Sequence, residues 1–384
     1  MNCSAYACIF GEIGIFILAF VYIFYPLFLK IYSIKTRSKK KTENLKRDKI
    51  FRKYSLTVII PFYNELHIIK KKLQSINIDA SKYKDFSAIV VNDGNNSFTD
   101  ADLLKSINPE DFKFKIKIMR LPEQFGKSFA QYAASRQTDS DYILITDSNS
   151  IFENNYFNIL SNHLTAGEDI FCGILRYKNN AAPEKSYWAL ESNLKLLEQK
   201  AGFYNTGLFG SNILIKRELY NKFPYYVLCD FSLPLYYQNE TNNRVFIKED
   251  LEVYENDADK LQETFKAKKR IIHRALFGLY KTFILSNRFN KVLFLQIFFH
   301  KILRWFTWLW ILFIIPYIYL TIKNIIFKQY FQIIIVLLLF VSIIYGAKKI
   351  FYAAAALTAS FLGVIHFFIK PQLNKWRPSE KTSI

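Results

Sequence analysis

The chain has 384 residues, and its 52 Lys and Arg exceed its 32 Asp and Glu to give a formal net charge of +20. This length permits one large domain with additional segments. A soluble domain so basic would suggest nucleic acid. Here apolar residues, 51% of the chain, gather at the two ends, so a membrane is the first partner to consider. The four cysteines lack zinc-ligand spacing and the pattern of a disulfide framework, which fits a reducing compartment.

An uninterrupted apolar run extends from Ile13 to Leu29 and, continued back to Tyr6, is long enough to span a bilayer. It lacks the basic start and small-residue cleavage site of a signal peptide, so residues 1–32 are predicted to stay as a transmembrane helix. The basic segment that follows, residues 33–54, is placed in the cytoplasm by the positive-inside rule. A nucleic-acid-binding arm is the competing interpretation, disfavoured because the basic cluster adjoins a hydrophobic span. The basic residues that follow the apolar run are Lys30 and, within the segment 33–54, Lys35, Arg37, Lys39, Lys40, Lys41, Lys46, Arg47, Lys49, Arg52 and Lys53.

Short runs of β-branched and aromatic residues alternate with helix-like segments in the middle of the chain. Such alternation indicates an α/β domain with a mostly parallel sheet. In such sheets, ligands bind outside the carboxyl ends of the strands. The predicted strands are 56–61, 86–91, 114–119 and 142–145, and the predicted helices are 65–76 and 127–136.

Polar side chains follow three of these strands, at what should be one edge of the sheet. Each alone is readily explained by a turn or a helix cap, because Asp and Asn favour such positions. Together they indicate a ligand site, and "YILITDSNSIF" suggests a strand that ends in oxygen ligands for a metal ion. Neither G-x-G-x-x-G nor G-x-x-x-x-G-K-[ST] occurs, so dinucleotide and P-loop chemistry are disfavoured. The residues are Tyr63, Asn64 and Glu65 after the first strand, Asn92, Asp93 and Gly94 after the second, and Asp147 and Asn149 after the fourth.

Apolar runs near the C-terminus predict further transmembrane helices within residues 303–370. Before them, residues 281–302 include most of "KVLFLQIFFHKILRW", whose mixture of apolar and basic side chains is typical of an interfacial helix. Three full crossings from the cytoplasm would leave the basic tail, residues 371–384, outside, against the charge rule. The sequence leaves open whether one of the last two runs is re-entrant or lies flat. The apolar runs are 303–321, 331–345 and 350–369.

With its elements in this order, the segment 55–280 resembles the family 2 glycosyltransferases, which are inverting GT-A enzymes that take sugars from nucleotide donors. The resemblance implies a Rossmann-like, mostly parallel α/β GT-A domain in the cytoplasm, between N- and C-terminal transmembrane helices. "HKILRW" entering a membrane segment resembles the membrane-bound bacterial branch that builds surface glycans. The matching stretches are "VIIPFYNE", "VVNDGNNSFTD", "FGKSFAQYAAS", "ILITDSNS", "GSNILIKREL", "CDFSLPL" and "KKRIIHRALFGL".

The resemblance implies that a nucleotide-sugar donor binds to residues matching the family's segments. The segment from Tyr63 to Glu65, with Asp93, matches those that hold the nucleoside, where a carboxylate can accept from a base N–H or a ribose hydroxyl. Gly126 and Lys127 open a helix, and its N-terminal dipole and the Lys charge are both expected to face the diphosphate.

Asp147 and Asn149 match the metal-binding D-x-D of the family, which implies a divalent cation, Mg²⁺ or Mn²⁺. Such a cation, held by oxygen ligands, neutralises the negative charge that grows on a departing nucleoside diphosphate. Asn149 stands in place of the last carboxylate, and this lowers the expected metal affinity because an amide carries no charge. Asn92 is a second departure, at a position where the family often has Asp.

Asp230 matches the catalytic base, which removes a proton from the acceptor hydroxyl during displacement at the anomeric carbon. The competing interpretation is an N-cap for a helix over residues 231–237. Cys229 precedes it where Glu or Asp is common. Arg270 and Arg274 are spaced to share one helix face, and the resemblance implies that they hold the diphosphate. Contact with lipid headgroups is the alternative role for these two arginines.

The sequence is therefore expected to encode a multi-pass enzyme of the cell (inner) membrane with a cytoplasmic catalytic domain. It would move one sugar to a lipid-linked or growing glycan acceptor in surface polysaccharide synthesis. A processive polysaccharide synthase is the alternative enzyme, although "RIIHRA" differs from the Q-x-x-R-W of cellulose- and hyaluronan-type synthases. A non-catalytic nucleotide-sugar-binding membrane protein is the alternative from another class, supported only by the Asn substitutions. Nucleic acid is not an expected partner, because Lys and Arg crowd the membrane flanks.

Overall fold

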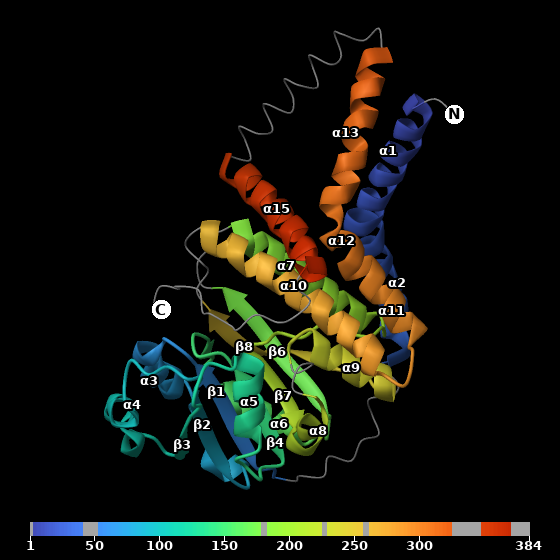
Figure 1. Cartoon of the computed structure of the whole chain (residues 1–384). Helices are drawn as coiled ribbons and strands as arrows, with labels where there is room; N and C mark the ends of the chain where they lie inside the picture. The colour runs from blue at the N-terminus through green and yellow to red at the C-terminus, as the bar shows by residue number, and fades with distance from the viewer. Residues whose placement is uncertain are drawn as a thin grey trace.

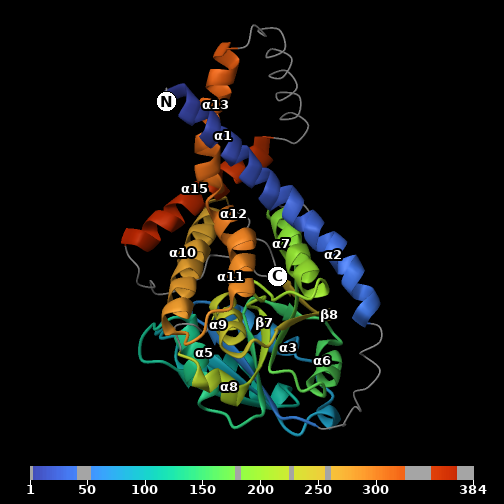
Figure 2. The ribbon, with the colours of Figure 1, turned by 90° about the vertical axis from the view of Figure 1, so that its right-hand side faces the viewer.

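The computed structural model describes residues 3–40, 53–177, 183–224, 229–255, 261–324 and 347–369. A domain built on one β-sheet occupies one end of the molecule, and long helices cover one side of it and extend away from it (Figure 1). The first helix of the chain and helices near the C-terminus meet in this helical part, as the perpendicular view also shows (Figure 2).

The sheet has eight strands in the order β3-β2-β1-β4-β7-β6-β8-β5. The first four in this order are parallel neighbours, with Ile59 of β1 opposite both Ile89 of β2 and Ile145 of β4. β7 runs antiparallel to β4 and to β6, so the second half of the sheet is mixed. The strands are β1 Leu56–Phe62, β2 Phe86–Asn92, β3 Lys115–Arg120, β4 Tyr142–Thr146, β5 Ile151–Phe152, β6 Ile170–Tyr177, β7 Asn212–Lys216 and β8 Phe246–Glu255.

Alternate residues of the strands point to opposite faces of the sheet, and helices bury both faces. In β1, Val58 belongs to the core shared with α3, α4 and α6, whereas Ile59 belongs to the core shared with α5, α8 and α9. Burial on both faces explains why β1, β2 and β4 are almost continuously apolar, whereas β3, at the edge of the sheet, alternates Lys with apolar residues. The helices are α3 Leu66–Gln74, α4 Asp100–Ile107, α5 Lys127–Ser135, α6 Tyr156–Leu164, α8 Arg217–Lys222 and α9 Ser232–Thr241.

The N-terminal apolar run forms one continuous helical segment made of α1 Cys3–Ala19, a π-helical turn at Phe20–Phe24 and α2 Tyr25–Lys40. Its stretch Tyr6–Thr36 is long and apolar enough to cross a membrane. α13, Thr307–Asn324, packs along α1 in both views (Figures 1 and 2). Gly14 permits this approach, since a Cβ there would lie 2.8 Å from the Trp310 carbonyl oxygen.

The remaining long helices connect this helical pair to the sheet domain. α7 Pro183–Lys200 lies against α2, and α15 Ala347–Ile369 packs on α10 Leu261–Leu285, where the His273 and His366 rings are 4.5 Å apart. α10 continues past residue 280 before the chain turns into α11 Lys291–Ile297, a π-helical turn at Phe298–Ile302 and α12 Leu303–Trp305.

A bend of 60° separates Lys291–Trp305 from Thr307–Leu320, and this pair qualifies as a second crossing only if both halves are counted as one span. The residues from 353 to 369 form a shorter apolar helix. The predicted run 331–345, the basic tail 371–384 and residues 41–52 of the basic segment lie outside the described residues. Among the described residues, therefore, one helix is long enough to span, or two with the bent pair.

Candidate active site

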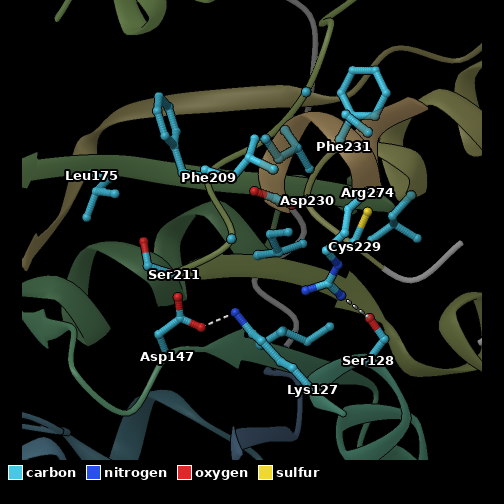
Figure 3. A pocket seen from close by; sticks show the side chains of 18 of the residues that line it. Lys127, Ser128, Asp147, Leu175, Phe209, Ser211, Cys229, Asp230, Phe231 and Arg274 are labelled. Atoms are coloured by element: carbon cyan, nitrogen blue, oxygen red, sulfur yellow. Dashed lines mark hydrogen bonds and ion pairs between the residues drawn. The ribbon is translucent and has the colours of Figure 1, made fainter. Parts of the chain in front are cut away.

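A cavity of about 340 Å³ opens where the carboxyl ends of β1 and β4 meet the start of α5 and the inner face of α10. Side chains from distant parts of the sequence surround it, as Figure 3 shows for Lys127, Asp147, Asp230 and Arg274. Seven of the residues predicted from the sequence line this cavity: Glu65, Lys127, Asp147, Asn149, Asp230, Arg270 and Arg274.

One wall of the cavity carries an ion pair between Lys127, the first residue of α5, and Asp147, which directly follows β4. Both side chains remain partly accessible, at 21% and 28%. Gly126, the N-cap of α5, has φ +97°, a conformation that other residues rarely adopt. The predicted helix start is therefore confirmed, and it places the Lys127 ammonium in the same cavity as the helix N-terminus.

Asp93 was expected to bind the nucleoside, but its side chain is 1% exposed and does not line the cavity. Its carboxylate instead accepts hydrogen bonds from the backbone N–H groups of Phe125 and Gly126, at 3.0 to 3.1 Å. In this structure Asp93 fixes the turn that leads into α5. It thus acts on the site through the position of Lys127.

Of the three predicted residues after β1, one lines the cavity and two do not. Glu65 lines the cavity and accepts a hydrogen bond from Ser148, between the two predicted metal ligands. Tyr63 and Asn64 are outside the cavity lining, and their backbone carbonyl and side-chain oxygens, respectively, accept from the Asn95 amide.

Asp230 lies on the opposite wall from the Lys127–Asp147 pair, beside Arg274 in the view of Figure 3. A Cβ on Gly210 would be 3.3 Å from its Oδ2, so the small residue leaves room for the carboxylate. The helix-cap interpretation is wrong: α9 begins at Ser232 with Phe231 as its N-cap, and no side chain caps it there. The Ser232 N–H instead lies 3.3 Å from Cys229 Sγ. The Asp230 carboxylate remains exposed to the cavity.

Arg270 and Arg274 both face the cavity from α10, which does not favour a role at lipid headgroups. Arg274 makes a long 3.4 Å contact with Ser128 Oγ in the first turn of α5. Burial and the neighbouring Arg274 charge lower the pKa of Arg270, and the Asp147 and Asp230 carboxylates oppose that shift. Arg270 is therefore close enough to both walls to experience both carboxylates.

The metal-binding prediction can be tested on the chemistry of its ligands. The Asp147 carboxylate and the Asn149 amide oxygen are ligands that Mg²⁺ and Mn²⁺ accept. In this structure the Asp147 carboxylate is paired with the Lys127 ammonium, so it faces a positive charge. In the described ranges no three or more His, Cys, Asp and Glu side chains gather into a metal site. Asp147 and Asn149 would thus supply two oxygen ligands, and a cation bound there would take its other ligands from a bound molecule or water.

The cavity also extends toward the helical part, through residues that the sequence did not single out. Trp188 and Glu191 of α7 line this end, together with Lys301 and Trp305 near the 60° bend. The same cavity is therefore lined both by Asp230 and by residues of the helical part.

A buried polar cluster supports this helical end of the cavity. Glu191 pairs with Arg304 at 2.9 Å and with Lys301, and its side chain is 3% exposed. Glu198, with no exposed side-chain surface, accepts from the Tyr25 hydroxyl at 2.8 Å and lies 2.7 Å from His300 Nδ1. The cluster joins the N-terminal helix to α7 and to the turn before α12.

Two buried lysines were likewise missed. Lys72 of α3 is fully buried behind the Asp147 loop, and Lys195 of α7 is 4% exposed and donates to the Leu208 carbonyl at 3.2 Å. The signal for Lys72 was present in the sequence, since residues 69, 72, 73 and 76 share one face of a helix and the other three are Ile, Leu and Ile.

The cavity thus places a carboxylate, Asp230, opposite positively charged side chains that suit a phosphate group. A carboxylate in such a position can act as a general base. Residues 57–223 match the family model described as glycosyl transferase family 2. Over 139 residues the chain is 30% identical to the poly-beta-1,6-N-acetyl-D-glucosamine synthase of Staphylococcus aureus (strain COL), which covers 34% of this chain and 32% of that protein. The chain thus matches about a third of the length of such curated relatives.

A solved structure resembles the chain over almost its whole length. The mannosyltransferase PcManGT from Pyrobaculum calidifontis, solved in complex with GDP-Man and Mn²⁺, aligns with a TM-score of 0.68 and 16% identity. The alignment covers 94% of this chain and 100% of that one. At this identity the likeness shows the fold, and it confirms the GT-A sheet predicted from the sequence.

Proposed function

Because residues 57–223 belong to family 2 of the glycosyltransferases, we propose that this chain transfers a sugar from a nucleotide-sugar donor to an acceptor hydroxyl, with inversion at the anomeric carbon. The observation that carries the proposal is the meeting of Asp230 with Lys127, Asp147, Arg270 and Arg274 around one cavity. The catalytic domain would work on the cytoplasmic side of a bacterial membrane, anchored by the Tyr6–Thr36 helix.

The donor's diphosphate would lie at the sheet edge, against the N-terminus of α5. Lys127 and the two α10 arginines supply positive charge there, and the α5 dipole adds to it. A divalent cation held by Asp147 and Asn149 would neutralise charge on the leaving diphosphate. Glu65 lies near enough to contact Ser148 and could accept from a donor hydroxyl group.

Asp230 would act as the general base. Its carboxylate takes the proton of the acceptor hydroxyl as that oxygen forms a bond to the anomeric carbon, while the bond from that carbon to the diphosphate oxygen breaks. Attack from the side opposite the leaving group requires the base and the diphosphate to be on different sides of the sugar. The positions of Asp230 and the Lys127–Asp147 pair on opposite walls are consistent with this geometry.

The acceptor would enter from the helical end of the cavity, past Trp188 and Trp305. A lipid-linked or growing glycan suits this route, because its anchor stays in the membrane while its sugar reaches Asp230. The finer identity of sugar, nucleotide and acceptor depends on the pocket's shape across several loops.

The test is release of nucleotide from UDP-, GDP- and TDP-sugars by the purified full-length protein, with and without EDTA. Turnover of at least one donor that EDTA abolishes is expected. Asp230→Asn should lower turnover by about 10²- to 10⁴-fold, the usual contribution of a general base, while donor binding persists. Undiminished turnover by Asp230→Asn would contradict the assigned base, and full activity in EDTA would contradict the metal role of Asp147 and Asn149.

A processive polysaccharide synthase is the second candidate, favoured by the 30% identity to a poly-N-acetylglucosamine synthase. Product length separates the two. A single transfer gives one product size whatever the donor excess, whereas processive synthesis gives products of many lengths from one donor.

A further inference from the structure

Lys72 is a lysine side chain with no exposed surface, in the last turn of α3. Its Nζ donates to Thr146 Oγ1 at 2.7 Å, to the Ser150 carbonyl at 2.7 Å and to Ser150 Oγ at 2.9 Å. An ammonium has three N–H donors, so these bonds use all of them. All three acceptors are neutral oxygens, so the hydrogen bonds offset only part of the cost of burying the charge.

The partners of Lys72 are the two flanks of the loop that carries the predicted metal ligands. Thr146 is the last residue of β4, and Ser150 precedes β5, so Asp147 and Asn149 lie between them. Ser150 Oγ also lies 2.9 Å from the Asp147 carbonyl oxygen, and Thr146 Oγ1 lies 2.6 Å from the Ser211 carbonyl oxygen. One buried ammonium therefore joins both ends of the loop.

The same helix holds the middle of the loop as well. Glu65, the N-cap residue of α3, accepts a hydrogen bond from Ser148. The Phe152 ring lies 3.7 Å from Lys72 Nζ on the side of β5. α3 thus contacts the loop before, within and after the pair of metal ligands.

Nearby charges act on Lys72 in both directions. Burial lowers the pKa of Lys72 and the Lys127 charge adds to that shift, whereas the Asp147 and Glu255 carboxylates, both of which line the cavity, oppose it. Asp147 is thus paired with Lys127 in the cavity and also favours the charged form of Lys72.

We propose that Lys72 is a positioning residue that fixes the loop from Thr146 to Ser150, so that Asp147 and Asn149 face the cavity ready to share a divalent cation with a nucleoside diphosphate. The inference rests on the proposed function. It adds a specific requirement. A divalent cation should raise the affinity for nucleotide to its full extent only when Lys72 is present, although Lys72 contacts neither the cation nor the nucleotide.

The experiment compares Lys72→Met with the unchanged full-length protein in detergent micelles. Calorimetry measures the dissociation constants of UDP and GDP with and without Mn²⁺, which requires no turnover. Met keeps the length of the side chain but removes the charge and the three donors. We expect the Mn²⁺-dependent gain in affinity to fall about tenfold or more, with the metal-free affinity changed less than about twofold.

Lys195→Met is the matched control, because Lys195 is also a buried lysine that lines the cavity but donates to Leu208, on the side of Asp230, and makes none of the hydrogen bonds to Thr146 or Ser150. It should keep the Mn²⁺-dependent gain even if it lowers the melting temperature as much as Lys72→Met does. The double variant Thr146→Val with Ser150→Ala removes hydroxyl acceptors of Lys72 while keeping the charge. It should reduce the gain in the same way, and adding Lys72→Met to it should bring little further loss, because coupled residues are not additive.

An unchanged gain in Lys72→Met would overturn the positioning role. An equal loss in Lys195→Met would overturn it as well, since the effect would then be general destabilisation. Tighter Mn²⁺-dependent binding in Lys72→Met would mean that the lysine only repels the cation, which also contradicts the proposal. If the unchanged protein binds neither nucleotide under any condition, the proposed function fails together with it.

Discussion

The two ends of the cavity use charged side chains in different ways. At the sheet edge, the Asp147 side chain is 28% exposed and that of its partner Lys127 is 21% exposed. Each side chain is therefore accessible enough to leave the ion pair and contact a ligand. At the helical end, Glu191 is 3% exposed and lies between Lys301 and Arg304, themselves 12% and 7% exposed. The charges of the first end are available for binding, whereas those of the second are committed to the fold.

This difference follows from what surrounds each group. An ion pair that water can reach contributes little to stability and is easily rearranged. A buried pair contributes little net stability when complete, yet losing one partner is costly because the other charge stays buried alone. We therefore expect substitutions at the helical end to change mainly stability, and substitutions at the sheet edge to change mainly nucleotide binding.

Glu191→Gln should have the largest effect on stability. It leaves Lys301 and Arg304 without their shared carboxylate, and breaking a buried pair in this way costs about 3–5 kcal/mol. Thermal unfolding in micelles, followed by circular dichroism, measures the loss as a lower melting temperature. Glu249→Gln is the control, since Glu249 pairs with Lys200 where both side chains are about half exposed, and it should change the melting temperature little. Equal melting temperatures for the two variants would contradict the contrast.

Lys127→Met should have the next largest effect, and it should weaken nucleotide binding instead of stability. Removing one charged hydrogen-bonding group from a diphosphate site costs about 1.5–3 kcal/mol, or roughly a 10- to 100-fold weaker affinity for UDP or GDP. The melting temperature should stay close to that of the unchanged protein, because the Lys127–Asp147 pair is partly accessible. Lys115→Met, an exposed lysine on β3, provides the control for loss of charge alone. A lower melting temperature for Lys127→Met, with normal nucleotide affinity, would contradict the proposal that the sheet-edge charges serve binding.

The sequence predicted the parallel half of the sheet and the sheet-edge end of the cavity well. Both depend on short stretches of sequence, namely each strand and the residues directly after it. β1, β2 and β4 are continuous apolar runs, and the residues after them must share an edge, so Glu65 and Asp147 meet as expected. The side-chain direction of Asp93 could not be predicted, since it depends on where the turn before Gly126 passes.

The helical end could not be predicted, because its contacts join segments that are far apart in the chain. Glu191, Lys195 and Glu198 recur at helical spacing and would be read as the solvated face of α7. In the fold that face meets α2 and the turn before α12, which buries all three. β8, whose sequence "FIKEDLEVYE" mixes apolar and charged residues, is likewise defined by its pairing with β6 and β5.

Tyr25→Phe should have the smallest effect and tests the contact between the N-terminal helix and the domain. It removes one hydrogen bond to Glu198, and the carboxylate keeps Thr206 as a donor at 3.0 Å and His300 as a neighbour. Because the acceptor stays partnered, the loss should be about 1 kcal/mol, near the mean for a single hydrogen bond. Tyr32→Phe, on the same helix but 40% exposed, is the control. A small drop in melting temperature for Tyr25→Phe alone, with nucleotide affinity unchanged, would show that this cluster holds the N-terminal helix to the sheet domain without taking part in binding.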